Sequence, residues 1–213
     1  MGDLCVADGQ KMVLIGDSIT DCGRRAEAAP LGCGYVAFFA DLLVARHPQR
    51  AVRVVNKGIG GNTAVELAAR WETDVLAERP DWLAVMIGIN DLHRTLAGVH
   101  HIPPPTYREL YTGLLQRVAD EVGPGLVLLE PFYMTTEQAA TEAQRQVLAA
   151  LEGYRAVVGE LAQRFAARRV PTHQVFQRQL RHRPPSAFGA EPVHPNRTGH
   201  VVIACALLDA LED

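Results

Sequence analysis

The chain has 213 residues, of which 48% are hydrophobic and 21% are charged, and its formal net charge is -3. This length and apolar content suit one domain over residues 1–213 with a sizeable core, and leave too little for two domains. The small net charge, without blocks of like charge, argues against nucleic acid or an anionic membrane as partners.

The N-terminal stretch MGDLCVADGQKM lacks a basic start followed by an apolar run, and no later stretch is long and apolar enough to cross a bilayer. We therefore expect a cytoplasmic protein without a secretory signal. The cysteines show neither metal spacing nor a Cys-x-x-Cys pair, so free thiols are expected and no metal site. They are Cys5, Cys22, Cys33 and Cys205.

Short apolar runs alternate along the chain with longer stretches whose apolar residues recur at helical spacing. In chain order the pattern predicts a strand over 11–16, a helix over 35–48, a strand over 51–58, a helix over 64–80, a strand over 81–88, a helix over 107–123, a strand over 125–132, a helix over 142–168, a fifth strand over 170–175 and a last helix over 198–211. Two proline-rich segments, 100–107 and 181–195, are expected to be surface loops. Continuously apolar strands separated by helices indicate an α/β fold with a parallel sheet of about five strands, covered on both faces.

In such folds ligands bind beyond the carboxyl ends of the strands. The first predicted strand ends in Gly16-Asp17-Ser18, the second leads into NKGIGGNT (56–63), and the third into GIND (88–91). A fourth polar segment, EPVHPN (191–196), lies near the C-terminus. Gly-Asp-Ser alone is ordinary turn chemistry, but the four segments together indicate a site at one edge of the sheet.

A serine hydroxyl becomes a good nucleophile only beside a base, usually a histidine whose tautomer is fixed by a third group. Ser18 and His194 can supply the first two groups. Glu191 precedes His194 by three residues, so its carboxylate can fold back onto the imidazole. Both Glu191 and His194 precede a proline, which favours an extended backbone and stiffens the segment.

Acyl transfer also needs hydrogen-bond donors aimed at the developing oxyanion. The Ser18 N–H, a backbone N–H of Gly60-Gly61 and the side-chain amide of Asn90 can act as these donors. The candidates come from separate segments but from the same end of the predicted sheet.

Other polar residues have plainer interpretations. Asp17 is expected to shape its turn, and Asn56 and Asp91 to organise their loops. The GIGGNT segment (58–63) is not followed by Lys-Ser/Thr, as a phosphate loop would be. His100-His101 lacks partner ligands at regular spacing, so a solvated loop is expected there.

The four segments resemble those of the SGNH branch of the GDSL-type esterases and lipases. The four residues that name that family correspond to Ser18 in GDSIT, Gly61 in GIGGNT, Asn90 in GIND and His194 in EPVHPN. The match spans nearly the whole chain, and the Gly-x-Ser-x-Gly elbow of ordinary α/β-hydrolases is absent. GDSITDCGRR, GCGYVA, RVVNKGIGGNT, PDWLAVMIGIND and VHPNRTGH look most like the small cytoplasmic acetylxylan esterases that deacetylate xylo-oligosaccharides.

The resemblance implies a three-layer α/β/α, flavodoxin-like fold and a serine esterase that needs no cofactor. It implies a catalytic triad formed by Ser18, His194 and Glu191. It also implies an oxyanion hole formed by Ser18, Gly61 and Asn90. It implies acetylated sugars as substrates and allows homo-oligomers. The residues expected to contact substrate are Asp17, His93 and Tyr133.

Two departures from the family pattern leave alternatives open. Glu191 stands where the family usually has aspartate, and Leu92-His93 follows GIND where xylan-active relatives tend to have an aromatic residue. One alternative is an SGNH hydrolase that acts on acyl thioesters, lysophospholipids or other short-chain esters. The other is a carbohydrate-binding relative with weakened catalysis.

Overall fold

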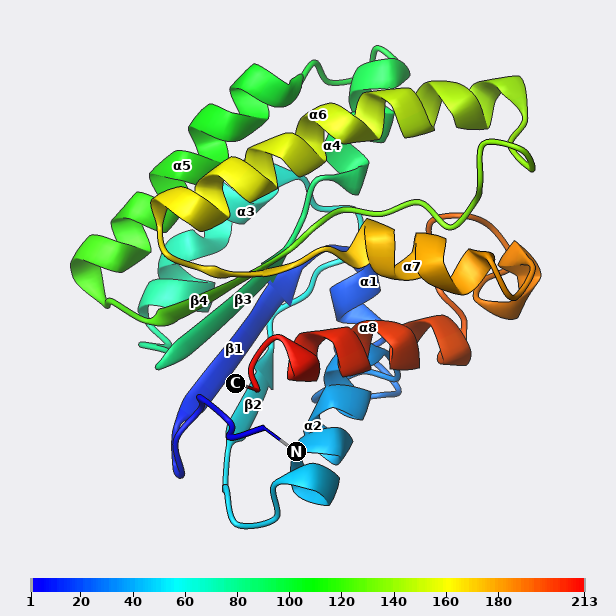
Figure 1. The fold of residues 1–213 in the computed structure, drawn as a ribbon. Helices are drawn as coiled ribbons and strands as arrows, with labels where there is room; N and C mark the ends of the chain where they lie inside the picture. Colours follow the sequence, from blue (N-terminus) through cyan, green and yellow to red (C-terminus); the bar gives the residue numbers. More distant parts are fainter. Residues whose placement is uncertain (1, 213) are drawn as a thin grey trace.

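A parallel sheet of five strands lies at the centre of the computed structural model, which describes residues 2–212 (Figure 1). The strand order is β2-β1-β3-β4-β5. The strands are β1 (Lys11–Gly16), β2 (Arg53–Asn56), β3 (Trp82–Met86), β4 (Gly125–Leu129) and β5 (Arg168–Val170). This order is that of flavodoxin-like folds, and it confirms the predicted α/β class with a five-stranded parallel sheet.

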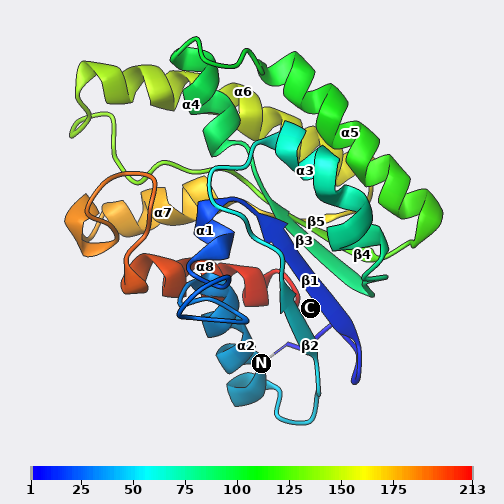
Figure 2. The same cartoon turned by 180° about the vertical axis from the view of Figure 1, so that it is seen from behind.

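Helices cover both faces of the sheet and give the predicted three layers (Figures 1 and 2). One face carries α2 (Tyr35–Arg46), α7 (Thr172–Leu180) and α8 (Arg197–Asp209), and α2 packs directly on α8. The other face carries α3 (Ala64–Trp71), α5 (Pro104–Glu121) and α6 (Glu142–Arg164). Among residues 2–212, no helix combines the length and the apolar character needed to cross a membrane.

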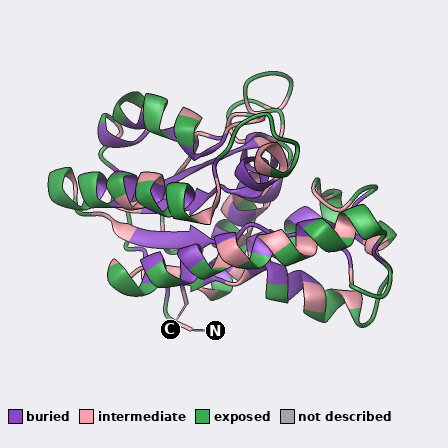
Figure 3. Ribbon diagram, turned by 90° about the horizontal axis from the view of Figure 1, so that it is seen from above, coloured by how far each residue is buried: buried purple, intermediate pink, exposed green. Residues whose placement is uncertain are grey.

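The strands and the inward faces of the helices are buried, as the view from above shows (Figure 3). Residues 12–16 of β1 are all buried, because a strand covered on both faces packs its side chains in both directions. The predicted apolar stripe of α6 also faces the core. Its buried members are Val147, Leu151, Tyr154, Val158 and Leu161.

Two helices at the rim of the sheet are missing from the predicted elements. These are α1 (Ser18–Asp21), a single turn, and α4 (Ile89–Leu96). One turn is too short to display a helical repeat, and five of the eight residues of α4 are polar or charged. The segments GDSIT and GIND were expected to be loops, but each one begins a helix.

The predicted fifth strand over 170–175 is wrong in its position. The strand β5 ends at Val170, and α7 begins at Thr172. Pro171 lacks an N–H and cannot continue the ladder, so the strand stops there. The buried residues that follow, Thr172, His173, Val175 and Phe176, lie on one side of a helix.

Several helix bounds also differ from the prediction. The predicted helix over 64–80 is α3 followed by a π-helical segment, Glu72–Leu76. The helix predicted to begin at residue 107 begins at Pro104, within the segment 100–107 that was expected to be a loop. Proline is tolerated in a first helical turn, since its missing N–H would have no partner there.

The direction of chain progression reverses between β1 and β3. From β1 the chain enters α2 on one face of the sheet, and from β3 it continues to α5 on the other (Figures 1 and 2). Such a reversal opens a crevice beyond the carboxyl ends of the two strands. Ser18 follows β1 and Asn90 follows β3, so both residues lie at this crevice.

Candidate active site

Ser18 is the first residue of α1, directly beyond the end of β1. Asp17 caps this helix, since its Oδ1 accepts the backbone N–H of Ile19 at 3.0 Å. The Ser18 side chain is half-buried at the rim of the sheet. A hydroxyl at the start of a rigid helical turn, with its backbone held by a buried cap, has a fixed position and remains reachable from solvent.

His194 lies beside Ser18, although 176 residues separate them. The distance from Ser18 Oγ to His194 Nε2 is 2.9 Å. His194 belongs to the loop before α8, whose first turn is capped by Asn196: its Oδ1 accepts the N–H of Gly199 at 3.1 Å. The structure therefore brings together the hydroxyl and the imidazole that the sequence placed at opposite ends of the chain.

Glu191 orients the imidazole from the far side. Its Oε1 is 2.7 Å from His194 Nδ1 and accepts the backbone N–H of His194 at 2.6 Å. Its Oε2 accepts the N–H of Val193 at 2.8 Å. A carboxylate facing Nδ1 favours the tautomer with the proton on Nδ1, which leaves the Nε2 lone pair for Ser18 Oγ.

The predicted oxyanion donors have N–H groups left over from the hydrogen bonds within the protein. Within residues 2–212, neither the Ser18 N–H nor the Gly61 N–H has a hydrogen-bond acceptor in the protein. Gly61 adopts a φ of 79°, a left-handed conformation that suits glycine. One N–H of the Asn90 amide donates to the Asn62 carbonyl at 3.0 Å, which fixes the amide and leaves its second N–H unassigned.

Arg70 joins the two loops that follow β1 and β2, and nothing in the sequence marks it for this role. Its guanidinium donates to the carbonyls of Gly16 at 3.0 Å and Lys57 at 2.6 Å, and to Asn62 Oδ1 at 2.7 Å. It also pairs with Asp74 at 2.7 Å. The loops that follow β1 and β2 are thus fixed to each other by one largely buried side chain.

Two further side chains hold the loop that contains Gly60 and Gly61, and neither was singled out from the sequence. Arg94 donates to the Gly61 carbonyl at 2.7 Å and to Glu66 at 3.1 Å. Asp21, at the end of α1, accepts the Gly60 N–H at 3.0 Å. The Gly60 N–H is therefore occupied, so of the two glycines it is Gly61 that has a donor to offer.

Two buried carboxyl groups lie beneath the site. Burial raises the pKa of Asp17 to about 7, against the opposing effect of the Ile19 N–H. Burial likewise raises the pKa of Asp91 to about 6, although the Ala64 N–H donates to it. Asp17 is only 1% exposed, which corrects the expectation that it contacts substrate: its carboxylate caps α1.

His93 and Tyr133, the other two predicted substrate contacts, lie next to each other and near Glu191. Their ring centroids are 6.0 Å apart. Burial lowers the pKa of His93, and the nearby Glu191 opposes this. The pKa of Tyr133 is raised, by burial first and by Glu191 second. Both side chains are therefore within electrostatic reach of Glu191.

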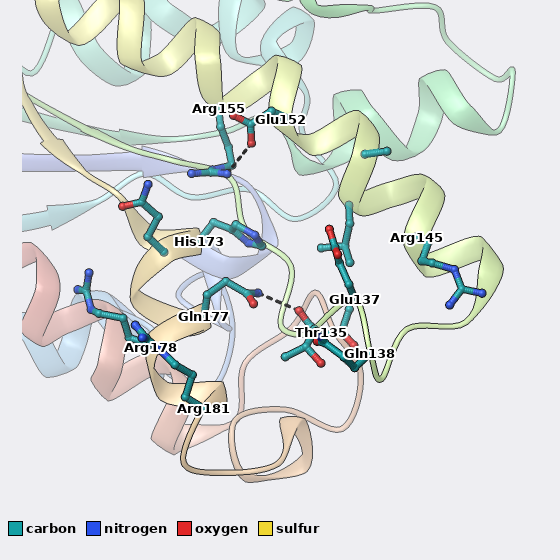
Figure 4. A pocket seen from close by; sticks show the side chains of 14 residues that line it. Thr135, Glu137, Gln138, Arg145, Glu152, Arg155, His173, Gln177, Arg178 and Arg181 are labelled. Carbon is teal, nitrogen blue, oxygen red and sulfur yellow. Dashed lines mark hydrogen bonds and ion pairs between the residues drawn. The ribbon is translucent and has the colours of Figure 1, made fainter.

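A cavity of about 1080 Å³ lies elsewhere, between α6, α7 and the segment after β4 (Figure 4). None of the residues that line it belongs to the Ser18 site. One of its arginines, Arg155, is already paired with the buried Glu130 at 2.9 Å and with Glu152 at 2.7 Å. In contrast, His194 and Glu191 lie on an open surface, with 61% and 47% of their side chains exposed.

The described part of the chain holds no cluster of three or more His, Cys, Asp or Glu side chains that is placed to bind a metal ion. The groups present at Ser18 are an oriented hydroxyl, a neighbouring imidazole and N–H groups without an acceptor among residues 2–212. Such a set can attack a carbonyl carbon and stabilise the tetrahedral intermediate that results.

Comparisons with known proteins agree with this chemistry. Residues 14–202 match the model of the GDSL-like Lipase/Acylhydrolase family. The chain is 38% identical to the acetylxylan esterase of Geobacillus stearothermophilus over 211 residues, which cover 95% of this chain and 94% of that protein.

Solved structures extend this similarity to the fold. The structure of the acetylxylan esterase Axe2 from Geobacillus stearothermophilus is similar with a TM-score of 0.87 and 37% identity, over 98% of this chain and 96% of Axe2. LAE5, an α/β hydrolase enzyme from the metagenome of Lake Arreo, Spain, is similar with a TM-score of 0.89 and 36% identity, over 98% of each chain.

Proposed function

Because the chain belongs to the GDSL-like lipase/acylhydrolase family and is a carboxylic ester hydrolase, we propose that Ser18, His194 and Glu191 are its catalytic triad and that acetylated xylo-oligosaccharides are its substrates. The proposed triad is supported above all by the distance of 2.9 Å between His194 Nε2 and Ser18 Oγ. The observation that carries the substrate is the similarity to an acetylxylan esterase along almost the full length of both chains.

The reaction begins with the transfer of the Ser18 proton to His194 Nε2. As this proton leaves, Oγ bonds to the acetyl carbonyl carbon and the carbonyl oxygen becomes an oxyanion. The C–O bond to the sugar then breaks, and the sugar oxygen takes the proton from His194. Glu191 holds the ring and stabilises its charged form while the proton resides there.

Water completes the cycle. His194 accepts a proton from a water molecule, which attacks the acetyl group on Ser18. When the second tetrahedral intermediate breaks down, acetate leaves and Ser18 Oγ recovers the proton. In both halves of the reaction the oxyanion is held by the N–H groups of Ser18 and Gly61 and by the free amide N–H of Asn90.

The exposure of the site supports a bulky alcohol as the leaving group. His194 and Glu191 are both about half exposed or more, so a sugar chain can approach the triad without entering a closed cavity. We propose that His93 and Tyr133 form the wall that contacts the sugar next to the cleaved ester.

The test is a substrate survey with a nucleophile variant as control. Release of the free carboxylic acid is measured from acetylated xylo-, manno- and cello-oligosaccharides, from aryl acetates and butyrates, and from acyl thioesters and lysophospholipids. The proposal predicts the highest kcat/KM on acetylated xylo-oligosaccharides and loss of turnover in Ser18→Ala.

Each alternative predicts a different result. A preference for thioesters, lysophospholipids or longer acyl chains would assign the protein to another branch of the family. Binding of oligosaccharides without acetate release by the wild-type chain would indicate a carbohydrate-binding relative. Self-association and a cytoplasmic location stay predictions, and the first is measured by light scattering across a range of protein concentrations.

A further inference from the structure

Cys22, one helical turn after Ser18, lies beside Cys33. Cys22 Sγ and Cys33 Sγ are 3.5 Å apart, and both residues carry unbonded thiols. The Cys33 N–H donates to the Cys22 carbonyl at 2.9 Å, which holds the two backbones together. The Cys22 N–H in turn donates to the carbonyl of Ser18 at 3.1 Å, so the pair is attached directly to α1.

The close approach of the two segments depends on the residue after Cys33. A Cβ atom at Gly34 would lie 2.8 Å from Cys22 Cβ and 2.9 Å from Cys22 Sγ. Only glycine fits there without displacing the thiol. The segment is therefore shaped to bring the two sulfurs close together.

The hydrogen-bonding groups around the pair fix where its protons lie. His200 Nδ1 accepts the Tyr35 N–H at 3.2 Å, so a neutral His200 carries its proton on Nε2. That Nε2 is 3.5 Å from Cys22 Sγ and donates to it. The Cys33 thiol donates to the Cys22 carbonyl at 3.3 Å, which leaves the Cys22 thiol to donate to Cys33 Sγ.

The two sulfurs differ in exposure. Cys33 is exposed, whereas Cys22 is partly buried. Burial raises the pKa of Cys22 to about 12, and the hydrogen bond with Cys33 adds to this. Cys22 thus stays protonated at neutral pH, and Cys33 is the sulfur that a dissolved oxidant meets first.

We propose that Cys22 and Cys33 form a reversible intramolecular disulfide when the protein meets a peroxide. The Cys33 thiolate attacks one oxygen of hydrogen peroxide, the O–O bond breaks, and Cys33 sulfenic acid and hydroxide form. Cys22 sulfur then attacks the sulfenic sulfur. The S–O bond breaks, the departing hydroxide takes the Cys22 proton, and the disulfide and water result.

This reaction needs only a small movement. The sulfurs must approach from 3.5 Å to about 2.05 Å, while the backbone hydrogen bond already joins the two residues. The bond would close the loop from residue 22 to residue 33 and join the end of α1 to the residue before the cap of α2. That loop also contacts the segment after β2, since Arg24 donates to the Gly58 carbonyl at 2.6 Å.

The expected effect is a rise in stability upon oxidation. Closing a loop of this length restricts the unfolded chain, and the thermal midpoint should rise by roughly 5–10 °C in the oxidised protein. Dithiothreitol should return it to the value of the reduced protein.

Peptide mapping tests the proposal directly, because trypsin cleaves after Arg24 and Arg25, between the two cysteines. The full chain is treated with hydrogen peroxide, blocked with an alkylating reagent and digested without reductant. We expect one linked species that joins residues 12–24 to residues 26–46, with the loss of two hydrogen atoms, and its disappearance after reduction. Cys205→Ser should give the same linked species, while Cys33→Ser and Cys22→Ser should give none.

Two results of the peroxide treatment would overturn the proposed disulfide. Oxidation of Cys33 to sulfinic acid without the linked species would overturn the proposal, as would a covalent dimer on a non-reducing gel. A linked species whose formation leaves the thermal midpoint unchanged would overturn the predicted stabilisation. Cys33 is exposed, so Cys33→Ser is expected to fold, and its reduced thermal midpoint serves as the reference if Cys22→Ser is unstable.

Discussion

One carboxylate oxygen of Glu191 meets His194 twice: Oε1 accepts the backbone N–H at 2.6 Å and lies 2.7 Å from the ring Nδ1. The same carboxylate also accepts the N–H of Val193 through its other oxygen. The longer side chain of glutamate, which stands where the family usually has aspartate, therefore folds back onto its own loop. The position of the imidazole depends on this single group.

The first prediction concerns that carboxylate. Glu191→Gln has the same shape but no charge, so it cannot stabilise the charged imidazole, and it can present an N–H to Nδ1. We expect kcat on acetyl esters to fall about 10²–10⁴-fold with KM changed less than about threefold. Steady-state kinetics measure this. Glu191→Asp, the matched control, should retain activity within about tenfold, and a Gln variant with more than a third of wild-type kcat would contradict the assigned role.

The second prediction concerns the oxyanion. Asn90→Ala removes the side-chain donor, and kcat should fall by about 10²–10³-fold with little change in KM, because the interaction forms only as charge develops. Since Asn90 also donates to the Asn62 carbonyl, the thermal midpoint must be compared with wild type. A fall in kcat below threefold in a folded variant would remove Asn90 from the oxyanion hole.

The third prediction concerns Arg70, whose guanidinium donates to two loop carbonyls and to Asn62. Arg70→Met keeps the aliphatic stem but leaves these acceptors without their donor. The free energy of unfolding should fall by about 2–4 kcal/mol, measured in urea, and kcat should fall with it. Arg117→Met serves as the control, since Arg117 is an exposed arginine paired with Glu72 and Glu121, and its replacement should leave stability nearly unchanged.

The fourth prediction follows from the buried carboxyl group of Asp17. Its folded-state pKa of about 7 lies above the unfolded value of about 4, so between these pH values the folded protein binds more protons. The contribution of Asp17 to stability is thus fully present below pH 4 and is lost as the pH rises toward 7. Asp17→Asn keeps a cap for α1 and removes this loss, so its stability relative to wild type should increase over that range. Unfolding in urea at several pH values measures the difference, and a difference independent of pH would contradict the buried, protonated carboxyl group.

Several features of the fold could be read from the sequence because they depend on local patterns. The strands appear as apolar runs, and the stripe on α6 appears at helical spacing. α1 and α4 could not be predicted in this way, since one is a single turn and the other is short and largely polar. The segment VPTHQV (170–175) looks like a strand because it is short and its few apolar residues are spaced apart. Only the position of Pro171 indicates where β5 ends and α7 begins.

The residues of the candidate site also differ in whether a local sequence pattern marks them. Ser18, Gly61, Asn90 and His194 lie in short segments whose residue types already indicate acyl transfer. Three further side chains bind backbone carbonyls and N–H groups of loops distant in the sequence, and no neighbouring residues mark them as part of the site. They are Arg70, Arg94 and Asp21. From the sequence, Asp17 is expected both to shape its turn and to contact substrate. Its burial in the structure supports only the role in the turn.

Covalent labelling tests most directly whether His194 activates Ser18. The protein is treated with a serine-directed phosphonate, and the rate and position of labelling are followed by intact mass and peptide mapping. We expect one label per chain, located on Ser18 within residues 12–24. The label should be absent in Ser18→Ala, and labelling should be slowed by about 10³-fold or more in His194→Ala. Label on a different serine, or full deacetylation by Ser18→Ala, would contradict it.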